Sequence, residues 1–302
     1  MALKDIKTKI QATQRMNKVT RAMEAVSAVK MRKTQQTAFG GRPYARAALA
    51  ILARLSGSQS LSGHPLTKTR EVKRTALVVI TSDKGLAGGL NSGVIKAAAA
   101  AVMDRPKDSV TVYAYGKKGE EYFARRDYAV ARAIENKIDD VPVSVMEELS
   151  DELSRGFLAG EYDEVLAVYS NFKSTFEQLP TLRTLLPLSV DSLAKLVADI
   201  QPVKGKWSES GPIASPASYS VEPSDEDILG ILVPKLVSVS LYHMLLEAKA
   251  SEHSARMVAM KNASDKSKDV VRDLTRKFNK VRQAAITREV SEIVSGREAL
   301  ST

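Results

Sequence analysis

The chain has 302 residues, of which 44% are hydrophobic but only 5% aromatic, and its formal net charge is +10. The absence of cysteine excludes disulfides, thiolate catalysis and cysteine-ligated zinc sites. No apolar run approaches the ~20 residues that span a bilayer, and the charged amino terminus does not resemble a secretory signal. We therefore expect a soluble protein, or one that is attached to a membrane only through its partners.

The positive charge is concentrated at the two ends of the chain. Residues 1–39 hold nine Lys or Arg against two Asp or Glu, and residues 235–300 hold thirteen against eight. Basic ends are typical of a protein with a polyanionic partner, either nucleic acid or an acidic protein surface. The alternative is that each end is an ordinary solvated helix face. Residues 1–38 contain no aromatic residue, so the stacking platform typical of nucleic-acid binding is missing there. This composition disfavours nucleic acid as the partner.

Residues 2–39 contain neither Gly nor Pro and predict one long helix. Apolar residues recur in it about every 3.5 residues, with Thr13 as a polar gap, and this spacing predicts the seam of a coiled coil. The predicted seam residues are Ile6, Ile10, Met16, Val19, Met23 and Val26. The helical pattern extends past Gly40 and Pro43 to about Leu55, before a loop rich in Gly and Ser.

The middle of the chain alternates between strand-like and helical patterns. Strands are predicted at residues 75–81, 109–115, 164–170 and 182–188, and helices at 90–103, 120–126 and 143–157. This alternation predicts a small, mainly parallel, Rossmann-like α/β domain over residues 70–200. Residues 201–224 follow as a connector rich in Pro, Gly and Ser, with Trp207 as a local packing residue.

A second long helix is predicted near the carboxyl terminus. Residues 235–295 contain neither Gly nor Pro, and a continuous helix of this length extends roughly 90 Å, which exceeds an ordinary globular domain. Gly296 is the expected stop. A second apolar stripe is formed by Val271, Leu274, Phe278, Val281 and Ala285.

The two long helices flank the α/β domain, so they must pair antiparallel if they pair along their stripes. The expected fold class is α/β, with a long antiparallel two-helix coiled coil plus the Rossmann-like domain. The expected divisions are 1–55 for the first helix, 70–200 for the α/β domain, 201–224 for the connector and 225–302 for the second helix.

The Gly-rich segment TSDKGLAGGLNSG at 81–93 follows a strand and opens a helix, which is where a phosphate-binding loop would lie. However, Lys84 precedes the glycines, and the Gly-Lys-Ser/Thr ending is missing. A tight backbone turn is therefore favoured over nucleotide binding. A nucleotide-binding α/β regulatory protein with coiled-coil arms remains the alternative hypothesis.

No catalytic, cofactor-binding or metal-binding residue is predicted. The three histidines, His64, His243 and His253, do not have a metal-binding spacing, since a helix separates the last two by about 15 Å. No nucleophile is accompanied by a base. No catalytic constellation is therefore visible in the sequence.

Three segments resemble the gamma subunit of F-type ATP synthases of the bacterial type. The run LKDIKTKIQATQRMNKVTRAMEAVSAVKMRK is similar to the opening helix of that family, and ALVVITSDKGLAGGLNSGVIK to its central motif. The run ASEHSARMVAMKNASDKSKDVVRDLTRKFNKVRQAAITREVSEIVSG is similar to its carboxyl-terminal helix. Departures from the family pattern are Ala87, Val281 and Arg297.

The resemblance implies a non-catalytic central-stalk rotor that couples rotation of the membrane c-ring, driven by protons or sodium ions, to ATP synthesis or hydrolysis. The implied partners are the alpha and beta subunits of the catalytic ring, the epsilon subunit and the c-ring, without nucleic acid and without direct membrane insertion. The implied location is the cytoplasmic face of the bacterial inner membrane, as a peripheral protein held through the complex.

The resemblance also implies which residues contact these partners. Met23 and Lys30 match the region that faces an acidic segment of the beta subunits. The positions that engage loops of the catalytic ring are Arg282, Gln283 and Thr287. Tyr219 and Glu222 match the foot that meets the c-ring.

Overall fold

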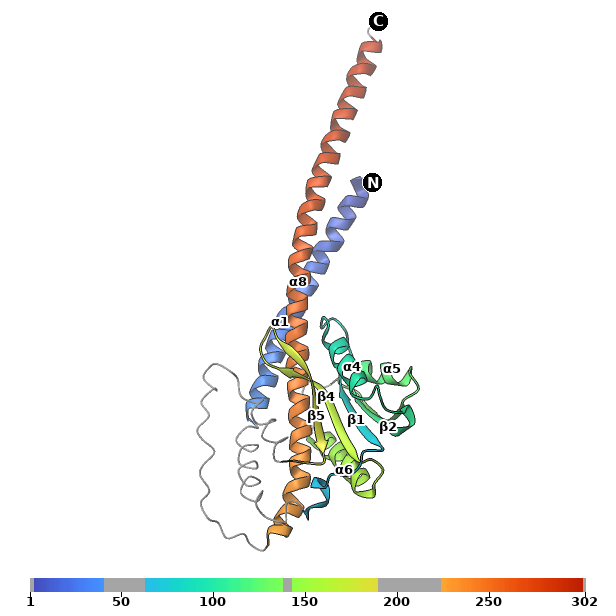
Figure 1. Ribbon diagram of the computed structural model, residues 1–302. Coiled ribbons are helices and arrows are strands. Elements are labelled where there is room, and N and C mark those ends of the chain that lie inside the picture. The colour runs from blue at the N-terminus through green and yellow to red at the C-terminus, as the bar shows by residue number, and fades with distance from the viewer. Residues whose placement is uncertain (1–2, 41–62, 138–142, 190–223, 301–302) are drawn as a thin grey trace. The chain divides into compact units, whose positions relative to one another are not determined.

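The computed structural model describes residues 3–40, 63–137, 143–189 and 224–300 (Figure 1). These residues divide between two compact units. One unit combines Met1–Ser27 with Met257–Thr302, and the other is Ala28–Arg256. The two long helices, α1 (Leu3–Gly40) and α8 (Asp225–Leu300), each pass from one unit into the other.

The first unit is an antiparallel pair of helices, as predicted (Figure 1). Asn17 of α1 donates hydrogen bonds to the backbone oxygen of Ser264 at 2.6 Å and to its Oγ at 3.0 Å. The buried or half-buried residues recur every three or four positions along each helix. They include Ile6, Ile10, Thr13, Asn17 and Thr20 on α1, and Met260, Ser264, Ser267, Val271, Leu274 and Phe278 on α8.

The predicted seam of α1 is partly wrong. Ile6 is buried, but Met16, Val19 and Val26 are 60%, 57% and 54% exposed. Thr13, predicted to be a gap, is half-buried in the row that contains Asn17. Adjacent helical residues point about 100° apart, so the apolar stripe lies one position away from a row of small and polar residues that is buried instead.

The stripe predicted on α8 is half-buried at Val271, Leu274, Phe278 and Ala285, whereas Val281 is 36% exposed. The predicted stop at Gly296 is wrong, because α8 continues to Leu300. Glycine weakens a helix by about 1 kcal/mol but keeps its backbone N–H, so it does not have to end one.

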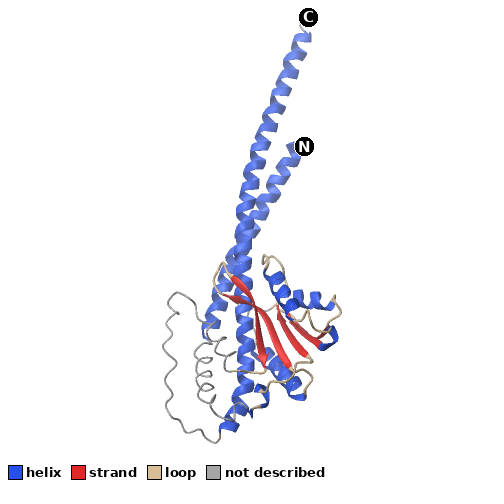
Figure 2. Cartoon of the chain, viewed as in Figure 1, coloured by secondary structure: helices blue, strands red, loops and turns tan. Residues whose placement is uncertain are grey.

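The second unit contains a five-stranded sheet in the order β3-β2-β1-β4-β5 (Figure 2). Its strands are β1 (Thr75–Ile80), β2 (Val110–Tyr115), β3 (Ala129–Ile134), β4 (Glu164–Phe172) and β5 (Gln178–Leu186). The first four strands are parallel, and β5 is antiparallel to β4. Strand β3 was not predicted, because an edge strand with the sequence AVARAI lacks the apolar run of a buried strand.

Helices cover both faces of this sheet (Figure 1). Helices α4 (Leu90–Ala101) and α5 (Lys117–Ala124) pack on one face through Val94, Ala98 and Phe123. Helix α6 (Val143–Ala159) and the first part of α8 pack on the other face. The core there includes Met146, Leu149, Leu153, Phe157, Leu229, Val233, Leu241 and Leu245.

One described helix, α8, contains a stretch that is long and apolar enough to cross a membrane by composition, and 56% of that stretch is buried within the protein. Leu229, Val233 and Leu241 place its first part in the core. Packing against the sheet therefore accounts for its apolar character.

Several predictions concern residues outside the described ranges. They are the helical extension to Leu55, the connector with Trp207, and the foot residues Tyr219 and Glu222. The division into 1–55, 70–200, 201–224 and 225–302 stays a prediction.

Candidate functional site

The Gly-rich segment forms a closed turn between β1 and α4. The Ser82 N–H donates to Asn91 Oδ1 at 3.0 Å, and Asn91 Nδ2 donates to Ser82 Oγ at 2.8 Å. Ser82 Oγ in turn donates to the Lys84 backbone oxygen at 2.5 Å. Leu86 and Gly88 have φ angles of 64° and 59°, which suit a tight turn. The side chains of Ser82 and Asn91 thus stabilise the backbone of the turn itself.

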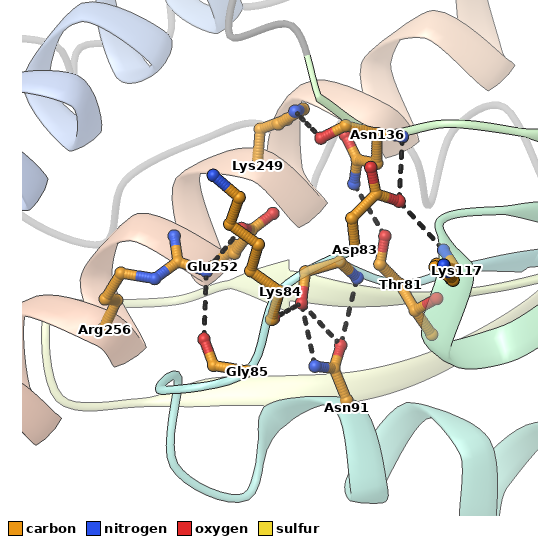
Figure 3. A network of polar contacts seen from close by, with 11 residues as sticks. Thr81, Asp83, Lys84, Gly85, Asn91, Lys117, Asn136, Lys249, Glu252 and Arg256 are labelled. Atoms are coloured by element: carbon orange, nitrogen blue, oxygen red, sulfur yellow. Dashed lines mark hydrogen bonds and ion pairs between the residues drawn. The ribbon is translucent and has the colours of Figure 1, made fainter.

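A polar network joins the carboxyl ends of β1, β2 and β3 (Figure 3). Asp83 Oδ1 accepts hydrogen bonds from the backbone N–H of Lys117 at 2.9 Å and of Asn136 at 3.0 Å. Asn136 Nδ2 donates to the Thr81 backbone oxygen at 2.6 Å. The network therefore fixes the loops that follow three parallel strands.

Glycine at position 116 is required by this close approach. Gly116 has a φ of 102°, and a Cβ atom there would lie 2.0 Å from the Thr81 backbone oxygen. Thr81 Oγ1 donates to the Gly116 oxygen at 3.1 Å and accepts from the Gly119 N–H at 2.9 Å.

Ligands of doubly wound sheets bind outside the carboxyl ends of the strands where the strand order reverses. Here that place lies between β1 and β4, and α8 occupies it. Ser251 Oγ donates to the Ser170 oxygen at 2.9 Å, and Ser254 Oγ donates to the Thr175 oxygen at 2.7 Å. Arg256 reaches the Gly85 oxygen at 3.4 Å (Figure 3). Side chains of α8 therefore bond to the backbone on both sides of this position, which is where related sheets bind nucleotides.

Tyr115 and His243 are titratable side chains in this part of the α/β unit. Burial, reinforced by the Asp83 carboxylate, raises the pKa of Tyr115 to about 12, so its phenol is neutral at physiological pH. His243 lies 3.5 Å from Glu247 on α8. Throughout the described ranges, no cluster of three or more potential metal ligands occurs.

The carboxyl-terminal end of α8 exposes a row of apolar side chains. Ile286, Val290, Ile293 and Val294 are 51%, 53%, 71% and 52% exposed. Asn17 lies opposite Ser264 in the antiparallel pair, so the first described residue of α1, Leu3, lies opposite residue 278. Helix α8 therefore continues beyond the described end of α1 (Figure 1). Sequence reasoning missed this row, although its helical spacing was a readable signal.

Comparisons with known proteins cover nearly the whole chain. The ATP synthase family model matches residues 2–300. The gamma chain of ATP synthase from Roseiflexus castenholzii is 40% identical over 304 residues, which are 99% of this chain and 98% of that one. The gamma chain from Moorella thermoacetica is 36% identical over 99% of both chains. The chain belongs to the ATP synthase gamma chain family.

Solved structures agree with this family assignment. A chain from the central stalk and c-ring structure of the Tetrahymena thermophila mitochondrial ATP synthase is 26% identical, with a TM-score of 0.60, and the match covers 82% of this chain and 99% of that one. A chain of the Euglena gracilis mitochondrial ATP synthase, at 17% identity and a TM-score of 0.63, shows the fold alone. As a gamma chain, this protein is a non-catalytic central-stalk subunit, which displaces the regulator hypothesis.

The structure separates the partner-contact residues expected for a gamma chain. Met23 and Lys30 are half-buried on α1, whereas Arg282, Gln283 and Thr287 are exposed on α8. Thr287 Oγ1 donates to the Gln283 oxygen at 3.0 Å. With Asn17 opposite Ser264, Met23 and Arg282 lie roughly 36 Å apart along the helix axis. Met23 and Arg282 therefore lie on separate parts of the helix pair.

The three departures from the family pattern have different surroundings. Ala87 is buried in the Gly-rich turn, with 2% exposure. Val281 lies at the edge of the α8 stripe, and Arg297 is exposed near the end of the helix. None of the three interrupts an element.

Proposed function

We propose that this gamma chain is the rotor that couples ion-driven rotation of a membrane c-ring to ATP synthesis or hydrolysis in a ring of alpha and beta subunits. The observation that carries this proposal is the exposed end of α8. Four large apolar side chains there are 51–71% exposed. Exposed apolar area costs roughly 25 cal/mol per Å², and a lone helix gains little stability without packing. A surrounding ring of subunits would bury this surface.

A second surface supports contact with the ring. Met16, Val19, Val26 and Val29 leave a stripe on α1 that is 54–68% exposed, and the half-buried Met23 lies within it. Residues 1–39, which include this stripe, hold nine Lys or Arg against two Asp or Glu. A partner segment that is both apolar and acidic fits this stripe, as proposed for the segment of the beta subunits that faces Met23 and Lys30.

The asymmetry of the helix pair supplies the coupling. Around the axis it presents apolar, basic and neutral polar side chains in different directions, so three identical neighbours meet different surfaces. Each neighbour is then stabilised in a different conformation, because a contact selects the state that it binds best. Rotation of the helix pair exchanges the three states.

The remaining partners follow from the same proposal. Tyr219 and Glu222 are assigned to the foot that meets the c-ring, and the epsilon subunit is a further partner of the stalk. The chain is held at the cytoplasmic face of the bacterial inner membrane as a peripheral protein, through the complex, without insertion of its own helices. Burial of the apolar part of α8 in the α/β core supports this arrangement.

The test replaces Arg282 and Gln283 by Ala in the assembled complex. Both are exposed, so the half-buried stripe at Leu274 and Phe278 stays intact and the complex should assemble with unchanged subunit stoichiometry. Each hydrogen bond to a charged group contributes roughly 1.5–3 kcal/mol. ATP hydrolysis and ATP-driven ion pumping should therefore both fall by about tenfold.

The matched control replaces the exposed neighbours Arg276 and Lys277 by Ala, six residues earlier on the same helix. This control should retain most of the hydrolysis rate. The assigned residues have no specific role if the Arg282→Ala/Gln283→Ala complex hydrolyses ATP at the unmodified rate. The same conclusion holds if the control loses as much ATP hydrolysis as this variant does. Failure of the complex to assemble would show that they are structural.

A further inference from the structure

Lys249 is an unusual residue for the core helix of an α/β unit. It lies on α8 with 2% exposure, and its Nζ donates to the backbone oxygen of Asn136 at 3.1 Å. A buried ammonium group loses its hydration, so it persists only where protein groups replace the water. An apolar side chain would satisfy packing alone at this position. The contact with Asn136 therefore indicates a role beyond filling the core.

The acceptor of Lys249 is itself rigidly held. Asn136 follows β3, and its N–H and side chain donate to Asp83 and Thr81 at 3.0 and 2.6 Å. Asp83 also accepts from the Lys117 N–H at 2.9 Å. Lys249 thus attaches α8 to the network that joins the ends of β1, β2 and β3 (Figure 3).

Other polar residues attach the same part of α8 to the opposite side. Glu247 Oε2 accepts from the Phe172 N–H at 3.0 Å, at the end of β4. Ser251 donates to the Ser170 oxygen at 2.9 Å, and Ser254 donates to the Thr175 oxygen at 2.7 Å. These contacts all lie on the side of β4 and its loop to β5.

The two sets occupy opposite faces of the helix. At about 100° per residue, Glu247, Ser251 and Ser254 fall within roughly 60° of one another. Lys249 and Arg256 lie roughly 180° away from that group, and Arg256 pairs with Glu252 at 2.7 Å and reaches the Gly85 oxygen. We name these five residues, Glu247, Lys249, Ser251, Ser254 and Arg256, the polar clamp.

A helix held from two opposite faces resists rotation about its own axis. Apolar contacts are non-directional and tolerate small rotations, whereas hydrogen bonds weaken steeply when donor and acceptor move apart or lose alignment. We propose that the polar clamp fixes the rotational setting of α8 against the sheet and bears torque, with Lys249 as the positioning residue on the side of the strand network. This inference rests on the proposed rotor function.

The test replaces Lys249 by Met, which keeps length and apolar volume but removes the donor. In the assembled complex, amide hydrogen exchange of residues 247–256 should accelerate by about tenfold, because one hydrogen bond to a charged group is lost. Ion pumping per ATP hydrolysed should fall, while ATP hydrolysis itself is retained. A merely structural role would lower the amount of complex, and hydrolysis and pumping in proportion, without changing their ratio.

Two further variants sharpen this test. Ser251→Ala removes a donor from the opposite face and should change exchange and pumping in the same direction, but less. Lys261→Met replaces an exposed lysine of α8 outside the clamp and should change neither. The proposal is overturned if both clamp variants pump the unmodified number of ions per ATP hydrolysed. It is also overturned if the Lys249→Met complex does not assemble while the Ser251→Ala complex pumps the unmodified number of ions per ATP. If the unmodified complex does not pump ions on ATP hydrolysis, the proposed rotor function fails instead.

Discussion

At the scale of single residues, a tight backbone constraint lies where β1 and β2 end. Gly116 lies against Thr81 so closely that an added Cβ would lie 2.0 Å from a backbone oxygen. Backbone atoms cannot move aside as a flexible side chain does, and a φ of 102° is unfavourable for any other residue. The polar network around Asp83 and Asn136 depends on this approach.

We expect Gly116→Ala to destabilise the α/β unit by roughly 3–5 kcal/mol, through the clash and the backbone strain together. The measurement is hydrogen exchange of β1 and β2 in the full-length chain. Gly85→Ala is the matched control in the neighbouring loop, because a Cβ there meets no atom within 4 Å. Equal protection of β1 and β2 in both variants would contradict the argument.

At the scale of elements, the pairing of α1 with α8 is more polar than an ordinary coiled coil. Thr13, Asn17 and Thr20 occupy buried or half-buried positions on α1, opposite a segment of α8 that includes Ser264 and Ser267. Small residues let the helices approach, but they bury little apolar area, so directional bonds must set the register. A buried polar side chain at such a position is the best-attested device for fixing register.

We expect Asn17→Ala to weaken this pairing by about 1 kcal/mol, the usual net contribution of a hydrogen bond. Amide exchange of residues 13–20 in α1 should then rise roughly fivefold, measured in the full-length chain. Gln14→Ala, an exposed position on the same helix, should leave exchange unchanged. If the two variants exchange alike, the Asn17–Ser264 contact does not stabilise the pair.

At the scale of the whole molecule, the described sheet has a strand order that reverses between β1 and β4, as in nucleotide-binding sheets, and α8 bonds to the loops at that edge. Ser251 and Ser254 of α8 bond to backbone oxygens at the end of β4 and in the loop after it, and Arg256 bonds to the Gly-rich turn. This arrangement agrees with the non-catalytic role of a gamma chain.

We expect the full-length chain on its own to show no ATP binding in the micromolar range. The Gly-rich turn lacks the Lys and hydroxyl at the positions that hold phosphates in the Gly-Lys-Ser/Thr motif, and Arg256 of α8 bonds to the backbone of this turn. Isothermal titration calorimetry checks this, with the assembled complex as the positive control. A saturable heat signal from the lone chain at micromolar ATP would contradict it.

The amino-acid sequence by itself determined the long helices, the buried strands and the family. The segments 2–39 and 235–295 lack Gly and Pro, so local geometry favours a helix in each of them. The strands β1, β2 and β4 appear as apolar runs because both their faces are buried. The segments at 3–33, 76–96 and 250–296 were specific enough to indicate the gamma chain family, which the comparisons confirmed. Strand β3 was missed because an edge strand has no such run.

Only the tertiary structure decided which stripe of α1 faces α8 and which faces outward. Met16, Val19 and Val26 are as apolar as seam residues, but apolar character does not show which partner covers a side chain. In this structure the row that contains Asn17 is buried instead. The polar clamp could not be predicted from the sequence either. Lys249 and Asn136 are 113 positions apart, and only the sheet topology brings them together. Periodicity is a property of one segment, whereas a contact depends on two.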